Sequence, residues 1–193
     1  MSVIFIRAAR SRGYICIGLA DGEERLTLTV SESDYERCGS PMQGDEVDSK
    51  SLDRLIFSDE CYRATLSALR ILSFSDNSER TLTIKLMRRG ISREVAEGAV
   101  REMVRLGYIN EREQLRRLVL SEARTLRGPL KIVAKLVSKG YSRPDIEWAM
   151  DSLAREGEID FNENARLLIT QKLTRGATDE QIKALLYKNG YNV

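Results

Sequence analysis

A period of fifty residues runs through roughly the last two thirds of this chain and constrains its fold more than any other feature. Two sets of residues keep the spacing: Gly90, Gly140 and Gly190, and Leu86, Leu136 and Leu186. The phrase KLMRRGIS returns as KLVSKGYS and then as LLYKNGYN. A period held over three units without a gap predicts stacked helical modules, because each unit must bury its apolar face against a neighbour.

Start and stop signals divide each unit into helices. Asn110, Asp160 and Thr178 are each followed three residues later by Glu or Gln, as in a capping box. The periodic glycines suit the left-handed residue that ends a helix. The first two units therefore predict three helices each: Asp59–Phe74, Ser78–Arg89 and Ser92–Leu106, then Asn110–Leu126, Gly128–Lys139 and Ser142–Glu156. The third unit predicts two, at Asp160–Arg175 and Thr178–Asn189.

The first part of the chain has a β pattern instead. Runs rich in Ile, Val, Leu, Tyr and Thr predict strands at Val3–Arg7, Tyr14–Leu19 and Arg25–Val30. Asp21-Gly22 predicts a hairpin turn between the last two strands, because both central residues tolerate a positive φ. A loop around residues 38–45 follows, with a transition to helix near Leu52.

The expected fold is mostly α, with tandem repeats of three-helix units after a small N-terminal β segment. The domain boundaries place an acidic β segment of about three strands and a linker at 1–58. Three-helix repeats follow at 59–109 and 110–159, and a truncated helical repeat at 160–193.

The composition argues against most kinds of active site. The chain has no histidine, which removes the commonest general base and most zinc sites. Cys16, Cys38 and Cys61 are too far apart for a CxxC pair, so reduced packing residues are expected. The carboxylates are dispersed, and we expect no enzyme activity, no metal and no cofactor. No apolar run could span a bilayer and the N-terminus lacks an export signal, so a cytoplasmic protein is expected.

Charge is distributed unevenly along the chain. Residues 1–61 carry 7 Lys and Arg against 12 Asp and Glu, a net of −5, whereas residues 62–193 carry 24 against 17, a net of +7. Within Arg112–Arg143 there are nine basic residues and two acidic ones, Glu113 and Glu122. The basic second repeat is therefore the part of the chain most suited to an acidic partner.

Lys131, Lys135 and Lys139 recur every fourth residue and would form a ridge about 12 Å long on one side of a helix. The rest of that helix is occupied by the apolar set Leu130, Ile132, Val133, Leu136 and Val137, so the ridge is expected to face solvent. No acidic residue lies within Arg124–Arg143 to compensate the ridge. A solvated helix face and a phosphate-binding surface both fit such a run, and the missing counter-charges favour the second.

Neighbouring helices extend this basic surface. The full set of candidate residues for nucleic-acid or partner binding is Arg116, Arg117, Arg124, Arg127, Lys131, Lys135, Lys139 and Arg143. Trp148 lies nearby in the sequence, and we interpret it as a packing aromatic rather than a base-stacking one, because tryptophan is highly buried on average.

The ordered phrases KLMRRGIS, REMVRLGYIN, LRGPLKIVAKLVSKGYS and SLAREGEID resemble the RecX family of bacterial regulatory proteins over about residues 59–193. The preceding stretch VSESDYERCGSPMQGDEVD looks like an extension found in some members. The resemblance implies that the three-helix units form a curved, elongated array. It implies a monomer that lodges in the groove of the filament formed by the RecA recombinase on single-stranded DNA, with duplex DNA left open as a further ligand. It also implies restraint of filament growth, ATPase and strand exchange in DNA repair, recombination and the SOS response, without a catalytic centre.

Two positions depart from the family pattern. Ser75-Asp76-Asn77 stands where basic residues are common, so the first repeat is expected to contact DNA weakly. The acid that follows the Gly-Tyr-Ile-Asn phrase is Glu111 in the first repeat and is replaced by Phe161 in the second. We expect that acid to cap or bridge helices, so its loss would affect packing more than function.

Two alternatives remain from the sequence. The third helix of each repeat follows a short glycine turn, as in helix-turn-helix proteins, so Ser142–Glu156 could serve a transcription factor as a recognition helix. The acidic residues Asp145, Glu147 and Asp151 on that helix are a poor complement to DNA. A metal-dependent nuclease is the other alternative, and no residue cluster favours it.

Overall fold

The structure is a computed structural model that describes residues 1–172 and 176–192. Its contacts divide the chain into two compact units. The first comprises Met1–Phe74 and Thr83–Leu106, and the second comprises Ser75–Leu82 and Gly107–Val193. The division falls within α3 (Glu79–Met87), whose first turn belongs to the second unit. No helix in the described ranges is long and apolar enough to cross a membrane.

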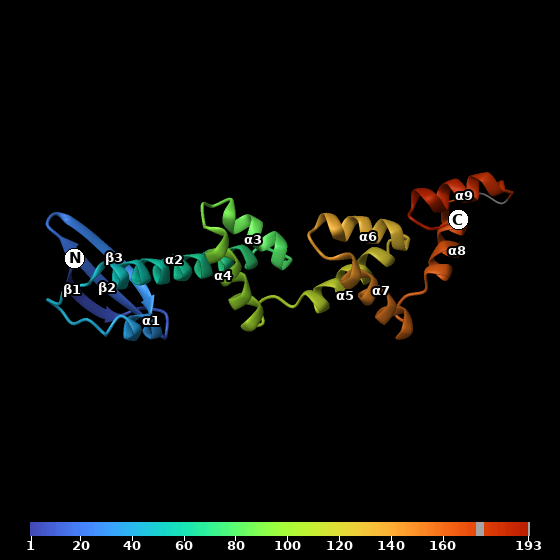
Figure 1. The fold of residues 1–193 in the computed structure, drawn as a ribbon. Coiled ribbons are helices and arrows are strands. Elements are labelled where there is room, and N and C mark those ends of the chain that lie inside the picture. The colour runs from blue at the N-terminus through green and yellow to red at the C-terminus, as the bar shows by residue number, and fades with distance from the viewer. Residues whose placement is uncertain (173–175, 193) are drawn as a thin grey trace. The chain divides into compact units, whose positions relative to one another are not determined.

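The first unit begins with an antiparallel sheet of β1 (Ser2–Ala8), β2 (Tyr14–Asp21) and β3 (Glu24–Ser31), in the order β1-β2-β3 (Figure 1). All three predicted strands are confirmed. The predicted turn is shifted by one residue: Asp21 pairs with Glu24, so Gly22 and Glu23 are the central residues. Of these, only Gly22 has a positive φ, of 59°. The hairpin therefore needs one glycine and not the Asp-Gly pair.

One face of the sheet forms the core of the first unit. Its buried side chains come from alternate positions of the strands, as expected for a half-buried sheet: Val3, Ile17, Leu19, Leu28 and Val30. Helix α1 (Glu32–Arg37) follows β3 directly, and its N-terminus is capped by the Ser31 hydroxyl, which accepts from the Asp34 N–H. The sequence pattern did not predict this short helix, because six residues hold too little periodic signal.

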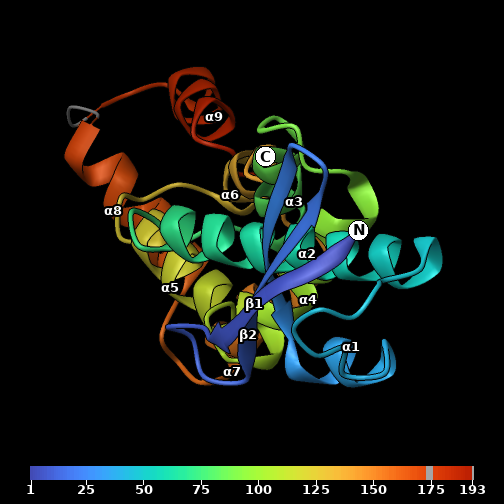
Figure 2. The same ribbon diagram turned by 90° about the vertical axis from the view of Figure 1, so that its left-hand side faces the viewer.

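Helix α2 (Ser49–Leu72) begins three residues before the expected transition to helix near Leu52. It continues without a break through the expected helix start at Asp59, so the predicted domain boundary between residues 58 and 59 lies inside a continuous helix. The Asp48 side chain caps its N-terminus by accepting from the Ser51 N–H. Leu52, Leu55 and Ile56 of the added turns pack on the sheet, and Figure 2 shows the strands in front of α2. Helix α4 (Arg93–Arg105) completes the unit and packs on α2.

The second unit is helical. It contains the first turn of α3 together with α5 (Glu111–Ala123), α6 (Pro129–Ser138), α7 (Arg143–Arg155), α8 (Phe161–Lys172) and α9 (Asp179–Lys188). The predicted helices agree with these bounds within a few residues, and the end of the expected helix Asp160–Arg175 lies outside the described residues. Asn110, Asp160 and Thr178 each accept a backbone N–H three residues ahead, as predicted.

Two junctions within this unit connect the start of one helix to the end of another. At one junction the Ser78 and Thr81 hydroxyls donate to the carbonyl of Lys139, at 3.0 and 2.7 Å. At the next, the N–H groups of Gly128 and Leu130 donate to the carbonyls of Asn189 and Gly190, at 2.8 and 3.0 Å. At each junction, hydroxyl or N–H groups at the start of one helix donate to the last carbonyl groups of another helix. Those carbonyl groups would otherwise lack hydrogen-bond partners.

Candidate nucleic-acid interface

Helices α5, α6 and α7 enclose one apolar core. Its centre includes Leu115 and Val119 of α5, Ile132 and Leu136 of α6, and Ile146 of α7. Tyr141 closes the corner between α6 and α7, and its hydroxyl lies 3.0 Å from Oε1 of the buried Gln114. Burial raises the pKa of Tyr141 to about 12, so this hydroxyl remains a hydrogen-bond donor at neutral pH.

Helix α6 is less amphipathic than its sequence predicts. Ile132, Val133 and Leu136 are buried as expected, but Leu130 is 49% exposed and Val137 is 45% exposed. Only part of the apolar set therefore faces inward. Three turns of helix cannot bury five apolar side chains spread this widely around the axis when only α5 and α7 cover one side. The result is an exposed apolar strip beside the lysine ridge.

An acid from another helix pairs with the middle lysine of the ridge. Lys131 and Lys139 are exposed, but Lys135 is half-buried because its ammonium group lies 2.5 Å from Oε1 of Glu122. The other carboxylate oxygen of Glu122 pairs with Arg127. Glu122 is 7% exposed, so this carboxylate is a buried anion held by two cations. The expectation that the ridge lacks counter-charges is wrong for Lys135, because Glu122 comes from the preceding helix and precedes the acid-free stretch of the sequence by two residues.

Arg116 joins α5 to α7. Its guanidinium group binds both carboxylate oxygens of Glu156, at 2.8 and 2.5 Å, and the Ser152 hydroxyl at 2.8 Å. A bidentate pair of this kind is stronger than a single contact and fixes the orientation of both side chains. The hydrogen bonds from Arg116, followed by that from Ser152, lower the pKa of Glu156 to about 2. Arg116 therefore serves mainly to hold the two helices together.

The lowered pKa of Glu156 predicts a pH-dependent contribution to stability. A carboxylate in an unfolded chain titrates near pH 4.3, so the ionised form of Glu156 stabilises the folded state fully above that pH. The contribution is lost as pH falls through the folded pKa of about 2. We expect Glu156→Gln to unfold more readily than the natural protein at pH 7 and to approach it between pH 4.3 and pH 2. Urea unfolding followed by the fluorescence of Trp148, the one tryptophan of the chain, measures the difference.

Glu158 supplies the control for that experiment, because it is an exposed acid two residues away. Glu158→Gln should change stability little at any pH. A Glu156→Gln deficit that is the same at pH 7 and pH 2.5 would contradict the prediction.

Two further predicted site residues form exposed ion pairs. Arg117 lies 3.0 Å from Asp76, and Arg143 lies 3.3 Å from Glu147. In all four side chains more than half of the surface is exposed, and such pairs contribute little to stability because water screens them. Both arginines can therefore exchange a carboxylate for a phosphate at small cost.

Three predicted site residues keep uncompensated charges: Arg124, Lys131 and Lys139. All three are exposed, and no acidic side chain within residues 1–172 and 176–192 pairs with them. Lys131 Nζ donates to the backbone carbonyl of Lys188 at 3.2 Å, which leaves its charge unneutralised. Of the eight candidate cations, three therefore have no acidic partner among the described residues and two form exposed ion pairs. The other three pair with Glu122 or Glu156 between the packed helices.

One cation–aromatic contact was not predicted from the sequence. The guanidinium carbon of Arg112 lies 5.0 Å from the ring centre of Trp148, which is 38% exposed. Trp148 is therefore a surface packing residue whose ring supports an arginine, and not a core residue. The two residues are far apart in sequence, and no local pattern could have paired them.

Comparison with known proteins adds the fold family. No protein-family model matches the chain, and no curated protein matches its sequence. The crystal structure of a regulatory protein RecX, in contrast, aligns over 99% of this chain and 94% of that chain, with a TM-score of 0.72 and 22% sequence identity. The chain has a RecX-like fold. The crystal structure of RecX from Lactobacillus salivarius covers 67% of this chain and 96% of that chain, with a TM-score of 0.44 and 18% identity.

The acid implied by the RecX resemblance has the expected role. Oε1 of Glu111, at the start of α5, accepts the N–H of Glu79 in the first turn of α3 at 2.7 Å. Phe161, which stands in its place one repeat later, is half-buried and packs against the α5–α7 core. The capping role expected of the acid is confirmed at Glu111, and Phe161 makes an apolar contact in its place.

Proposed function

We propose that this protein is a non-enzymatic regulator that binds the RecA–single-stranded DNA filament and restrains its ATPase, growth and strand exchange. It acts in the cytoplasm as a monomer and needs no cofactor. The RecX-like fold over 99% of the chain carries this proposal. The basic second repeat supports it, because a filament that contains DNA presents phosphates.

Within the basic surface, the cations divide by role. Arg124, Lys131 and Lys139 bind phosphate directly, since no acidic side chain among the described residues competes for them. Arg117 and Arg143 join when phosphate displaces Asp76 and Glu147. Arg116, Arg127 and Lys135 keep α5, α6 and α7 in place through Glu156 and Glu122. The apolar strip of Leu130 and Val137 lies on the same helix and suits contact with the recombinase rather than with DNA.

An ATPase titration tests the proposal. Adding the protein to RecA on single-stranded DNA should slow ATP hydrolysis at or below one copy per recombinase subunit. The titration should be repeated with a severalfold excess of DNA, because simple competition for DNA is relieved by excess and binding to the filament is not. An unchanged ATPase rate at every ratio in low salt would overturn the proposal.

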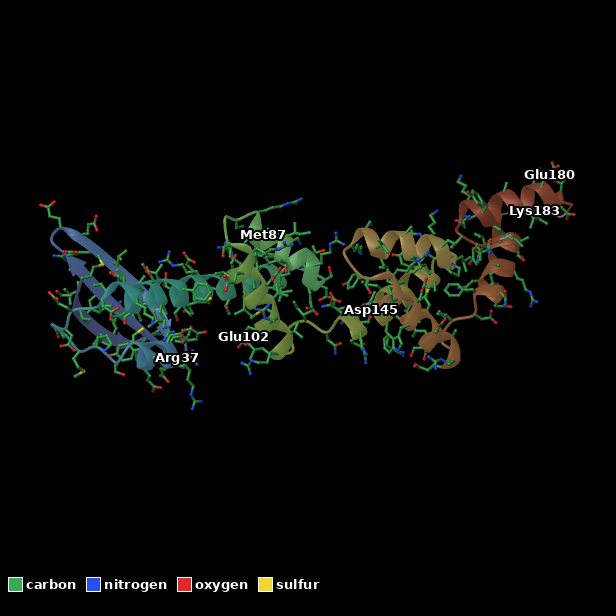
Figure 3. All side chains as sticks on the ribbon, in the orientation of Figure 1. Arg37, Met87, Glu102, Asp145, Glu180 and Lys183 are labelled. Carbon is green, nitrogen blue, oxygen red and sulfur yellow. The ribbon has the colours of Figure 1, made fainter. Side chains whose placement is uncertain are left out.

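The recognition-helix alternative is not favoured. Asp145, Glu147 and Asp151 of α7 are all exposed, and Figure 3 shows Asp145 at the start of that helix. In helix-turn-helix proteins the first residues of the recognition helix enter the major groove, where these carboxylates would face phosphate-lined walls. Footprinting on duplex DNA should therefore reveal no defined site.

A further inference from the structure

The first unit contains a second polar site, on the face of the sheet opposite its core. Arg7, Cys16 and Thr29 lie directly opposite one another across the three strands, so their side chains share this face. Phe5 and Tyr14 occupy other positions of the same face, which follows from the two-residue alternation of strands. A solvated sheet face normally carries polar residues, so these aromatic rings call for an explanation.

An open hollow of about 480 Å³ lies on this face. Its lining includes Arg7 and Arg10 at the end of β1, Cys16 and Thr29 from the sheet, and Tyr62 from α2. The volume lies within the range of sites for small organic ligands and far exceeds the volume of a lone phosphate or sulfate ion.

The charge at the hollow is opposite to that of its surroundings. Residues 1–61 are acidic overall, yet the first twenty contain Arg7, Arg10 and Arg12 and no acidic residue. Neither Arg7 nor Arg10 forms an ion pair with any residue that the structure describes. Asp59 accepts the N–H of Thr29, a residue of the lining, and is itself paired with Arg63 at 2.7 Å. The hollow therefore offers two guanidinium groups whose charges no described acid neutralises.

The aromatic groups at the hollow are held in place. The Tyr62 hydroxyl lies 2.9 Å from the Ser11 hydroxyl, and its ring centre lies 4.7 Å from that of Tyr14. The Phe5 ring lies over Gly18, where any Cβ would overlap it, and the Arg7 guanidinium carbon lies 5.4 Å from the Phe5 ring centre. Arg7 and Tyr62 are thus oriented before any ligand arrives, which lowers the entropy cost of binding.

We propose that this hollow binds a nucleoside phosphate, either free or as one nucleotide of a single strand. Arginine forks match phosphate oxygens with two parallel hydrogen bonds, and Arg7 and Arg10 contribute two such side chains to the lining. Aromatic side chains beside cations on an antiparallel sheet bind unstacked bases by stacking, and Tyr62 supplies that ring here. The Thr29 hydroxyl is available to a sugar or base edge.

This site is independent of the basic helices, because all of its residues belong to the first unit and those of the proposed filament interface belong to the second. A failure to bind nucleotide in the hollow would therefore not overturn the proposed regulation of RecA, and a failure of that regulation would not overturn nucleotide binding in the hollow.

Titration of the ¹⁵N-labelled full chain tests the proposal, with amide chemical shifts as the readout. Adenosine 5′-monophosphate should give saturable shifts at Arg7–Arg10, Cys16 and Thr29, whereas adenosine and inorganic phosphate should each bind at least tenfold more weakly. If a short oligodeoxyadenylate shifts the same amides and binds more tightly than the mononucleotide, the ligand is a single strand. If the mononucleotide binds more tightly, the ligand is a free nucleotide. Absence of saturable shifts there with both ligands overturns the proposal, as does phosphate binding as tight as that of the nucleotide.

A matched pair of variants checks the role of arginine. Arg10→Gln should weaken nucleotide binding about tenfold, the typical effect of losing a charge-assisted contact. Arg25→Gln makes the same change of charge at an exposed position of β3 outside the hollow, and it should bind like the natural protein. Equal affinities of the two variants would contradict the assignment, and an unchanged amide spectrum away from the hollow verifies that both are folded.

Discussion

Replacement of Arg124, Lys131 and Lys139 together by glutamine is expected to weaken binding to single-stranded DNA about a hundredfold at 0.1 M salt. Each phosphate contact makes the slope of log K against log salt more negative by about 0.7 for single strands, so the loss of three contacts should make the slope less negative by about 2. The choice of residues follows from the ion pairs. Lys135 is omitted because it forms an ion pair with Glu122. Arg124 is included because no acid among the described residues pairs with it.

The control variant carries the same loss of charge elsewhere. Arg25, Arg70 and Arg101 are exposed arginines of the first unit, and their joint replacement by glutamine should leave the salt slope nearly unchanged. Fluorescence anisotropy of a labelled oligonucleotide at several salt concentrations measures both variants. Equal slopes for the two triple variants would mean that the basic surface of the second unit is merely solvated.

Replacement of Gly190 by alanine is expected to open the junction between α9 and α6, at a cost of about 3 kcal/mol. Gly190 has a φ of 85°, which an L-residue adopts only with strain. A Cβ at this position would also overlap the Cβ of Lys131 and lie 2.5 Å from its backbone nitrogen. Since α6 cannot shift without disturbing its own core, the expected response is separation of the two helix ends.

Amide hydrogen exchange of Leu130 measures this opening, because its N–H donates to the Gly190 carbonyl across the junction. A cost of about 3 kcal/mol corresponds to exchange on the order of a hundredfold faster. Gly157→Ala provides the control: Gly157 has a φ of 76°, but an added Cβ would meet no atom within 4 Å among the described residues, so that variant should bear only the backbone strain. Unchanged exchange at Leu130 in Gly190→Ala would show that the junction tolerates the extra methyl group.

The repeat architecture could be predicted because its signals are local. A capping residue acts on an N–H three residues ahead, and a glycine with positive φ ends a helix by its own backbone freedom. Both are therefore visible in a few consecutive residues. The start of a helix near Leu52 was predicted, but its continuity with the helix expected from Asp59 was not. Leu52, Leu55 and Ile56 are stabilised by the sheet, and a contact with residues far away in the chain leaves no periodic pattern of its own.

The amino-acid sequence by itself determined the three-helix repeat, the small β segment, and the concentration of cations in the second repeat. Only the tertiary structure decided which of those cations remain available to bind phosphate or another acidic partner. Glu122 neutralises Arg127 and Lys135, and Glu156 holds Arg116. The physical reason is that an ion pair depends on distance in space, and the packing of α5, α6 and α7 brings together charges that the chain separates.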